Sequence, residues 1–196
     1  MICVSKLWRP LVFGFAAAGF CVGLALAQSV PLAERISRCT SCHGDDGNSR
    51  TANMPSIAGQ PQFFLLNQIV LMREGVRKVE AMTPFVKDLK DDDIQALATH
   101  FSNLPSKPSG EPIDEQLVKR GAELADARRC GSCHLPNLAG QLQMPRLAKQ
   151  RVDYLFQSLK EYRDSTRAGA DTAMSANIAG LSDADLVALA HYSASK

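Results

Sequence analysis

Apolar residues recur at helical spacing along most of the 196-residue chain, and no stretch shows the alternation of a half-buried strand. The pattern predicts helices that begin near Pro31 and Asp114, and a third over residues 61–74, where a proline suits the first turn. A later apolar stripe is formed by Ile94, Leu97, Ala98 and Phe101. Its counterpart near the C-terminus is formed by Leu186, Leu189 and Ala190. The fold class predicted from this periodicity is all-α.

The first 27 residues follow a different pattern. Lys6 and Arg9 precede an uncharged apolar run over residues 11–26, and residues 25–27 (ALA) resemble a small-residue cleavage site. We therefore expect residues 1–27 to be an export signal, cleaved before Gln28. An uncleaved anchor is the alternative, although the apolar run is slightly short for a membrane span.

The remainder of the chain is duplicated. Residues 54–60 (MPSIAGQ) recur ninety positions later as residues 144–150 (MPRLAKQ). Residues 89–98 recur as residues 181–190 with an offset of 92. A repeat over this length indicates two copies of one structural module.

A short segment separates the two copies. Residues 104–112 contain three prolines and a glycine, a composition that interrupts a helix and predicts an extended linker. We expect two domains, residues 28–107 and residues 108–196. Each would be marginally stable as a small helical unit without further support for its core.

Charge gives little reason to expect an acidic polymer as partner. Removing Lys6 and Arg9 with the signal takes the formal net charge from +2 to 0, which argues against nucleic acid binding. Seven basic residues do cluster between positions 119 and 151: Lys119, Arg120, Arg128, Arg129, Arg146, Lys149 and Arg151. This cluster has two interpretations, a solvated face or a docking surface on the second module for a partner with an acidic rim.

The cysteines carry the most specific chemistry. Two of the six, Cys3 and Cys21, lie in the expected signal, and the other four form Cys-x-x-Cys-His motifs at residues 39–43 and 130–134. On a helical turn both thiols and the imidazole lie on one side and can face a single flat ligand. This is the c-type haem attachment motif, in which the thiols bind the porphyrin vinyl groups and the histidine ligates iron. Two covalently attached haems are therefore predicted.

The predicted attachment residues follow directly from the two motifs. The thioether links are expected at Cys39, Cys42, Cys130 and Cys133, and the iron ligands at His43 and His134. No cysteine is left for a disulfide, which suits export to a compartment where haem is attached after translocation. A zinc ribbon is disfavoured because Cys42 and Cys130 are 88 residues apart, against about 15 to 20 in such sites.

The second axial ligand of each iron should lie at matched positions of the two modules. Two methionine pairs satisfy this requirement, Met54 with Met144 and Met82 with Met174. The second pair is favoured, because its members lie 43 and 44 residues after the first cysteine of their motifs with a helix between. That helix can carry the chain to the opposite haem face, whereas Met54 and Met144 lie close to their histidines.

The axial ligands of the two irons indicate whether the protein is an electron carrier or an enzyme. His100 and His191 lie on the last helices, but their positions do not match, so ligation of each iron by two histidines is disfavoured. Histidine and methionine on both irons leave no easy site for oxygen or peroxide. The sequence therefore predicts one-electron transfer with no enzymatic activity, and it argues against a dihaem peroxidase.

The whole mature chain resembles the dihaem cytochrome c4 family, which has two class I cytochrome c modules in tandem. The resemblance rests on the repeated Cys-x-x-Cys-His motif, the Pro-x-Leu/Ile-Ala-x-Gln segment, an aromatic-Leu helix and a distal methionine. It implies that Met82 and Met174 are the axial methionines. It also implies that the carbonyls of Pro55 and Pro145 accept the other imidazole proton of the two ligating histidines. The chain departs from the pattern modestly, with Leu135 where the first module has Gly44, and Lys149 where it has Gly59.

The function expected from these features is electron transport in the periplasm. The resemblance implies a soluble or peripherally membrane-associated dihaem carrier between a quinol-oxidising complex or dehydrogenase and a membrane-bound haem-copper terminal oxidase. The alternative is a dedicated cytochrome subunit of a dehydrogenase complex, such as a sulfide-oxidising flavocytochrome.

Overall fold

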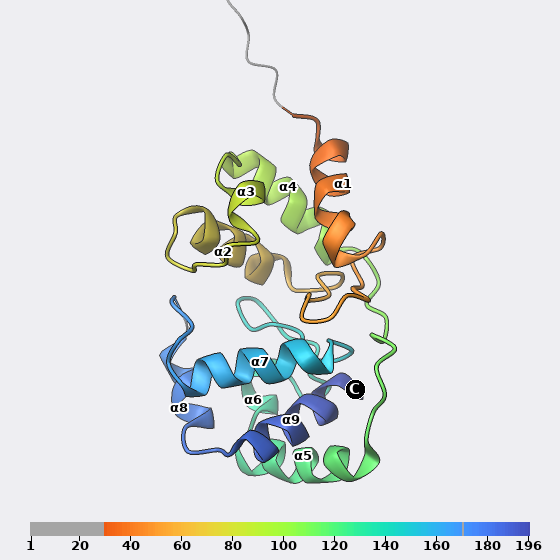
Figure 1. The fold of residues 1–196 in the computed structure, drawn as a ribbon, viewed down its shortest axis with the longest axis vertical. Coiled ribbons are helices and arrows are strands. Elements are labelled where there is room, and N and C mark those ends of the chain that lie inside the picture. The colour runs from red at the N-terminus through yellow and green to blue at the C-terminus, as the bar shows by residue number, and fades with distance from the viewer. Residues whose placement is uncertain (1–29, 170) are drawn as a thin grey trace, which may run out of the picture.

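The computed structural model of the protein describes residues 30–169 and 171–196. The expected export signal, residues 1–27, lies outside these residues. The described residues form nine helices and no strand. Figure 1 shows α1–α4 gathered in an upper lobe and α5–α9 in a lower lobe, which confirms the predicted all-α fold.

The upper lobe contains the helices expected in the first module, and one that was not expected. Its helices are α1 (Leu32–His43), α2 (Gln62–Arg73), α3 (Thr83–Val86) and α4 (Asp91–Ser102). The helices α1 and α2 begin one residue after Pro31 and Pro61, as predicted. The four-residue α3 is too short to produce a periodic apolar pattern, so the sequence did not reveal it.

The lower lobe repeats this arrangement, except that its first helical segment is divided. Its helices are α5 (Glu115–Ala127), α6 (Gly131–His134), α7 (Val152–Arg163), α8 (Thr172–Ile178) and α9 (Asp183–Ala194). The segment that runs continuously as α1 is divided here into α5 and α6. Arg129 adopts a left-handed conformation (φ 54°), and the Cys130 amide donates to the Ala125 carbonyl at 2.9 Å, which closes the end of α5.

Polar side chains define the starts of the lower helices. The Asp114 carboxylate accepts from the amides of Gln116 and Leu117 at the start of α5, so it satisfies two of the amides that lack helical partners. Ser182 and Asp185 form the capping box at the start of α9, as their spacing indicates.

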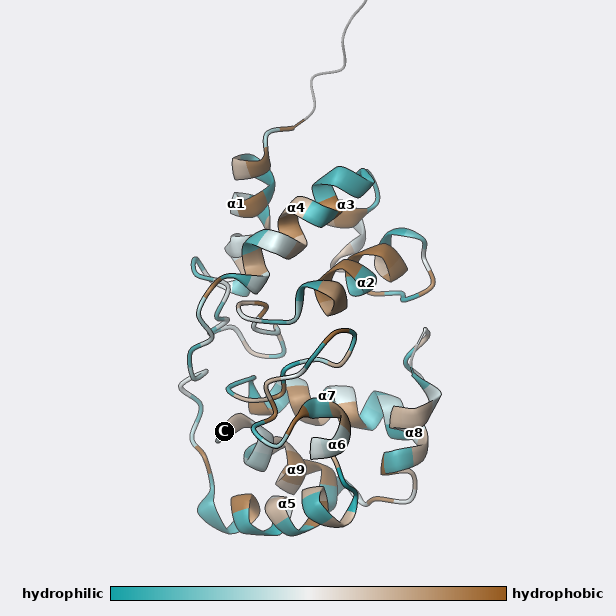
Figure 2. Ribbon diagram, turned by 180° about the vertical axis from the view of Figure 1, so that it is seen from behind, coloured by the Kyte–Doolittle hydropathy of each residue, from teal (hydrophilic) through white to brown (hydrophobic). Residues whose placement is uncertain are grey.

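The apolar stripes form the two cores. Ile94, Leu97, Ala98 and Phe101 of α4 are all buried, as are Leu186, Leu189 and Ala190 of α9. In the lower lobe α9 packs against α5 and α7. Figure 2 shows that the helices differ in hydropathy: α2 and α9 are mostly brown (hydrophobic), whereas brown and teal (hydrophilic) alternate along α5. Partly buried Cys39 and Met82 pack against the upper core, and Cys130 and Met174 against a core cluster of the lower lobe.

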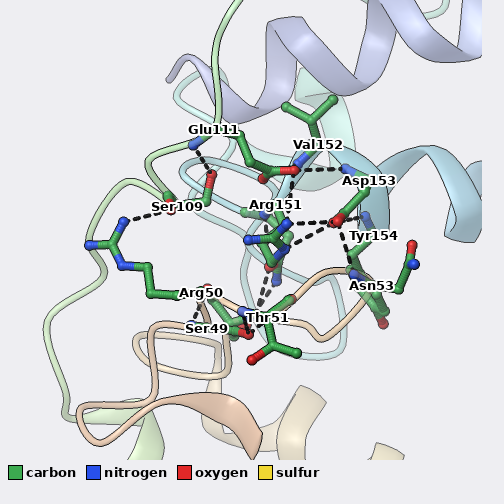
Figure 3. A network of polar contacts seen from close by, with 12 residues as sticks. Ser49, Arg50, Thr51, Asn53, Ser109, Glu111, Arg151, Val152, Asp153 and Tyr154 are labelled. Carbon is green, nitrogen blue, oxygen red and sulfur yellow. Dashed lines mark hydrogen bonds and ion pairs between the residues drawn. The ribbon is translucent and has the colours of Figure 1, made fainter.

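The segment between the lobes is extended, as predicted, and it is also held in place. Residues 103–114 contain no helix and run along one side of both lobes (Figure 1). Asn48 receives a hydrogen bond from the Lys107 amide at 2.8 Å and donates one to the Pro105 carbonyl at 3.1 Å. Further along, Glu111 accepts from the Val152 amide at the start of α7 and pairs with Arg151 at 3.1 Å (Figure 3). The predicted domain boundary at residue 107 falls within this anchored segment.

Among the described helices, none combines the length and the apolar character that crossing a membrane requires.

Candidate haem-binding sites

A large cavity lies between the helices and receives residues from both lobes. Its volume is about 1050 Å³, and the six cysteines and histidines of the two motifs all line it. The lining also contains apolar side chains of both cores, including Leu65 and Leu159. A volume of this size matches the upper end of ordinary ligand pockets, which reach about 1000 Å³.

His43 lies at the C-terminal end of α1 and is buried. Its Nδ1 atom lies 2.8 Å from the Pro55 carbonyl oxygen. A carbonyl can only accept, so Nδ1 carries the proton and Nε2 keeps its lone pair for a metal. Burial lowers the pKa of His43, and the hydrogen bond to Pro55 opposes part of this shift. The effect of burial is the larger, so the imidazole is kept neutral, which is the form that ligates iron.

His134 repeats this arrangement in the lower lobe. Its Nδ1 lies 2.9 Å from the Pro145 carbonyl oxygen, and burial again lowers its pKa against the effect of that bond. The predicted contacts to Pro55 and Pro145 are therefore confirmed in both lobes.

The four motif cysteines have matched environments in the two lobes. Cys39 and Cys130 are partly buried, whereas Cys42 and Cys133 are exposed. Burial raises the pKa of the Cys39 and Cys130 thiols. Each lobe thus presents one inner and one outer thiol next to its buried imidazole, which suits attachment to two vinyl groups on one edge of a porphyrin.

All four candidate methionines line the cavity: Met54, Met82, Met144 and Met174. Met82 immediately precedes α3, and Met174 lies within α8. These are the two short helices that the sequence did not predict. Two local signals could have revealed them: Pro84, in the first turn of α3, and Asp171, whose carboxylate caps α8.

The other two histidines make contacts elsewhere. The Asp114 amide donates to His191 Nδ1 at 3.2 Å, and the His100 ring packs edge-on against Phe101 with 5.0 Å between ring centroids. These positions agree with the sequence argument against ligation by two histidines.

The repeated MPxxAxQ segments face each other across the junction between the lobes, a feature that sequence reasoning missed. Gln150 accepts from the Ser56 amide and donates to the Ser56 carbonyl, both at 2.8 Å. Gln60 makes the same pair of bonds to the backbone of Arg146, both at 2.9 Å. Because both pairs of partners are related by the ninety-residue repeat, the junction has approximate twofold symmetry.

Charge at the cavity is predominantly positive. The basic residues that line it are Arg38, Arg77, Lys78, Arg129, Arg146 and Arg167. The acidic residues that line it are Glu161 and Asp171. Two of the seven basic residues between positions 119 and 151, Arg146 and Arg151, are buried. The exposed basic surface of the second module is therefore smaller than the sequence suggests.

The residues present fit two haems. Each lobe supplies a thiol pair, a neutral imidazole and a matched methionine at an apolar cavity, and the buried Arg146 Nε has no hydrogen-bond partner among the described residues. A buried cation with one N–H left without a partner is a group that a porphyrin carboxylate would complement. The fold and these sites define a dihaem c-type cytochrome of two class I modules.

Comparison with known proteins identifies the family. Residues 118–195 match the family described as Cytochrome c, and residues 33–100 match that described as Cytochrome C oxidase, cbb3-type, subunit III. The cytochrome c4 of Azotobacter vinelandii is 34% identical over 174 residues, which cover 79% of this chain and 82% of that protein. The chain belongs to the cytochrome c4 family, and it is an electron-transfer cytochrome with two covalently bound c-type haems.

Two further relatives extend the comparison. The crystal structure of reduced cytochrome c4 from Pseudomonas stutzeri superposes with a TM-score of 0.75 at 30% identity, over 85% of this chain and 98% of that chain. A protein of Thiomonas intermedia named thiosulfate dehydrogenase electron acceptor is 28% identical, over 94% of this chain and 90% of that protein.

Proposed function

We propose that the protein carries single electrons in the periplasm from a quinol-oxidising complex or a dehydrogenase to a membrane-bound haem-copper oxidase. The observation that carries the proposal is the matched set of ligand side chains at the cavity in both lobes. A carrier needs two low-spin irons with closed coordination, and a methionine in each lobe supplies the closing ligand. An enzyme of the peroxidase kind would need one open or displaceable position.

In this proposal each domain, residues 28–107 and residues 108–196, holds one haem. The thioethers form at Cys39, Cys42, Cys130 and Cys133. The axial pairs are His43 with Met82, and His134 with Met174. When bound, each haem supplies a reversible one-electron change at iron. The protein orients the imidazoles through Pro55 and Pro145 and surrounds each iron with apolar side chains.

The choice of methionine is supported by the position of the proline carbonyls. Pro55 holds the imidazole of His43, so Met54, the preceding residue, belongs to the histidine side of the site. Met82 comes from a separate wall, between α2 and α3, and packs with the upper core. The same contrast separates Met144 from Met174 in the lower lobe. In this proposal the ligand opposite His43 is therefore Met82, and the ligand opposite His134 is Met174.

Export supports the periplasmic location. Residues 1–27 have the pattern of a cleaved signal, and the four remaining cysteines all belong to haem motifs. Peripheral association with the membrane would bring the carrier close to membrane-bound partners.

Substitution of the methionines tests the proposed ligation. Met82→Ala and Met174→Ala should each abolish the methionine-to-iron absorption of one haem and produce one high-spin ferric centre. The matched controls Met54→Leu and Met144→Leu should keep two low-spin centres. Loss of methionine absorption in the control variants, with retention in Met82→Ala and Met174→Ala, would reverse the assignment.

A second candidate function is that of a dedicated electron acceptor for a dehydrogenase. The similarity to the thiosulfate dehydrogenase electron acceptor over nearly the whole chain favours it. A sulfur-oxidising dehydrogenase would then be the donor, in place of the quinol-oxidising complex. Stopped-flow reduction by each purified donor separates the two functions, because the physiological donor should reduce the cytochrome much faster than the other.

A further inference from the structure

We propose that Arg146 is a shared counter-cation of the two haems, and that its buried guanidinium complements haem propionates and raises both midpoint potentials. The inference rests on the proposed carrier function, but it does not depend on which methionines ligate iron.

Arg146 is a buried cation without an acidic partner. Its side chain lines the cavity, and the residue is 4% exposed. Within residues 30–169 and 171–196, no carboxylate forms an ion pair with it, and Nε has no hydrogen-bond partner. Burial lowers its pKa to about 10, so the guanidinium is still charged at neutral pH. A buried charge of this kind normally has a compensating anion.

The guanidinium bridges equivalent positions of the two lobes. Nη2 donates to the Ala58 carbonyl at 2.8 Å, and Nη1 donates to the Ala148 carbonyl. Ala58 and Ala148 are equivalent residues of the ninety-residue repeat. The position equivalent to Arg146 itself is Ser56, so the junction contains one such arginine and not a symmetric pair.

The cavity has the charge that two haems would balance. Its lining contains six basic and two acidic side chains, an excess of four positive charges. Two haems bring four propionates. The acidic Glu161 already pairs with Arg167 at 3.0 Å. Propionates are therefore the anions that this cavity is suited to receive.

Arg151 provides a contrast from the same loop. It is also buried, but its guanidinium pairs with Glu111 at 3.1 Å and with Asp153 at 2.7 Å (Figure 3). Its charge is therefore balanced by the protein itself, whereas that of Arg146 is not.

A positive charge in a low-dielectric junction favours the reduced form of a nearby iron, because reduction adds an electron. Because Arg146 contacts both lobes and lines the cavity that they share, we expect its charge to act on both irons. Arg146 should therefore raise both potentials together and contribute little to the difference between them.

The test compares midpoint potentials of the purified dihaem protein by spectroelectrochemical titration. Arg146→Gln should lower the reduction equilibrium constant of both haems by roughly tenfold, which is about 59 mV for a one-electron couple. Arg146→Ser, which copies Ser56, is a second neutral variant should the first fail to fold. Arg146→Lys should retain potentials near the wild type, and the matched control Arg151→Gln should move neither haem.

Unchanged potentials in the neutral variants would overturn the proposal, as would an equal fall in Arg151→Gln or Arg146→Lys. A change in the midpoint potential of only one haem would contradict the proposal that Arg146 is shared by both. Failure of the proposed carrier function would be visible in the wild-type titration itself, before any variant is compared.

Discussion

Gln150 connects the lobes through a pair of hydrogen bonds whose loss should be measurable. Its amide satisfies both the N–H and the C=O of Ser56 at 2.8 Å, and Ser56 is 1% exposed. Gln150→Ala leaves both backbone groups buried without these partners. The same substitution also removes the acceptor of the Arg151 amide.

The expected cost follows from the burial of these groups. An unsatisfied buried donor or acceptor costs about 1–3 kcal/mol, so the Ser56 pair should cost roughly 2–6 kcal/mol in the free energy of unfolding. For a chain of this size each kcal/mol corresponds to about 2–4 °C, so the melting temperature should fall by roughly 4–24 °C. Gln60→Ala should have a similar effect, because Gln60 makes the equivalent bonds to Arg146.

The assay is urea unfolding of the purified dihaem protein, followed by far-ultraviolet circular dichroism at pH 7. The matched control is Gln62→Ala, since Gln62 bonds Thr99 on the exposed surface and should change the free energy of unfolding by less than about 0.5 kcal/mol. If Gln150→Ala unfolds with the same free energy as Gln62→Ala, the junction does not depend on these hydrogen bonds.

Two further predictions concern backbone strain and pH. Lys149 has φ 58° where the first module has Gly59 at φ 64°, so Lys149→Gly should relieve strain and raise the free energy of unfolding by roughly 0.5–1 kcal/mol. Lys119→Gly, within α5, should lower it by about 1 kcal/mol, and urea unfolding of both variants measures the contrast. The Lys107 ammonium, 2.6 Å away, lowers the pKa of Asp46 from 3.8 to about 2. The stabilisation from Asp46 should therefore be complete above about pH 4 and disappear as the pH falls toward 2. Wild type and Asp46→Asn should differ in unfolding midpoint at pH 7 and converge near pH 2, and a constant difference would contradict this.

The sequence predicted the features that depend on local pattern. The starts of α1 and α2 and the buried stripe of α4 follow from the spacing of residues along one helix, which does not depend on how the helices pack. The carbonyl contacts of Pro55 and Pro145 came from the family resemblance, and the structure contains both.

Other features depend on how the two copies pack, which a repeat alone does not specify. The ninety-residue offset shows that residues 54–60 and 144–150 are equivalent, but it does not show that they face each other. The bonds of Gln60 and Gln150 were therefore not predicted. For the same reason Arg146 and Arg151 count as surface charge in the sequence, although both are buried at or beside the junction.

The short helices α3 and α8 illustrate a different limit. Four and seven residues give too few turns for an apolar stripe, and such helices depend on tertiary packing for their stability. Nevertheless, Met82 immediately precedes α3, and Met174 lies within α8. The matched methionines were therefore identified by alignment of the copies, without knowledge of the local structure around them.

The central claim is that both irons have closed coordination and exchange one electron each. The most direct measurement is a redox titration of the wild-type protein monitored by visible absorption. It should show two low-spin centres with methionine-type absorption, positive midpoint potentials and two electrons taken up per chain. A high-spin ferric component, or a single titrating centre, would contradict the account and indicate an open iron site.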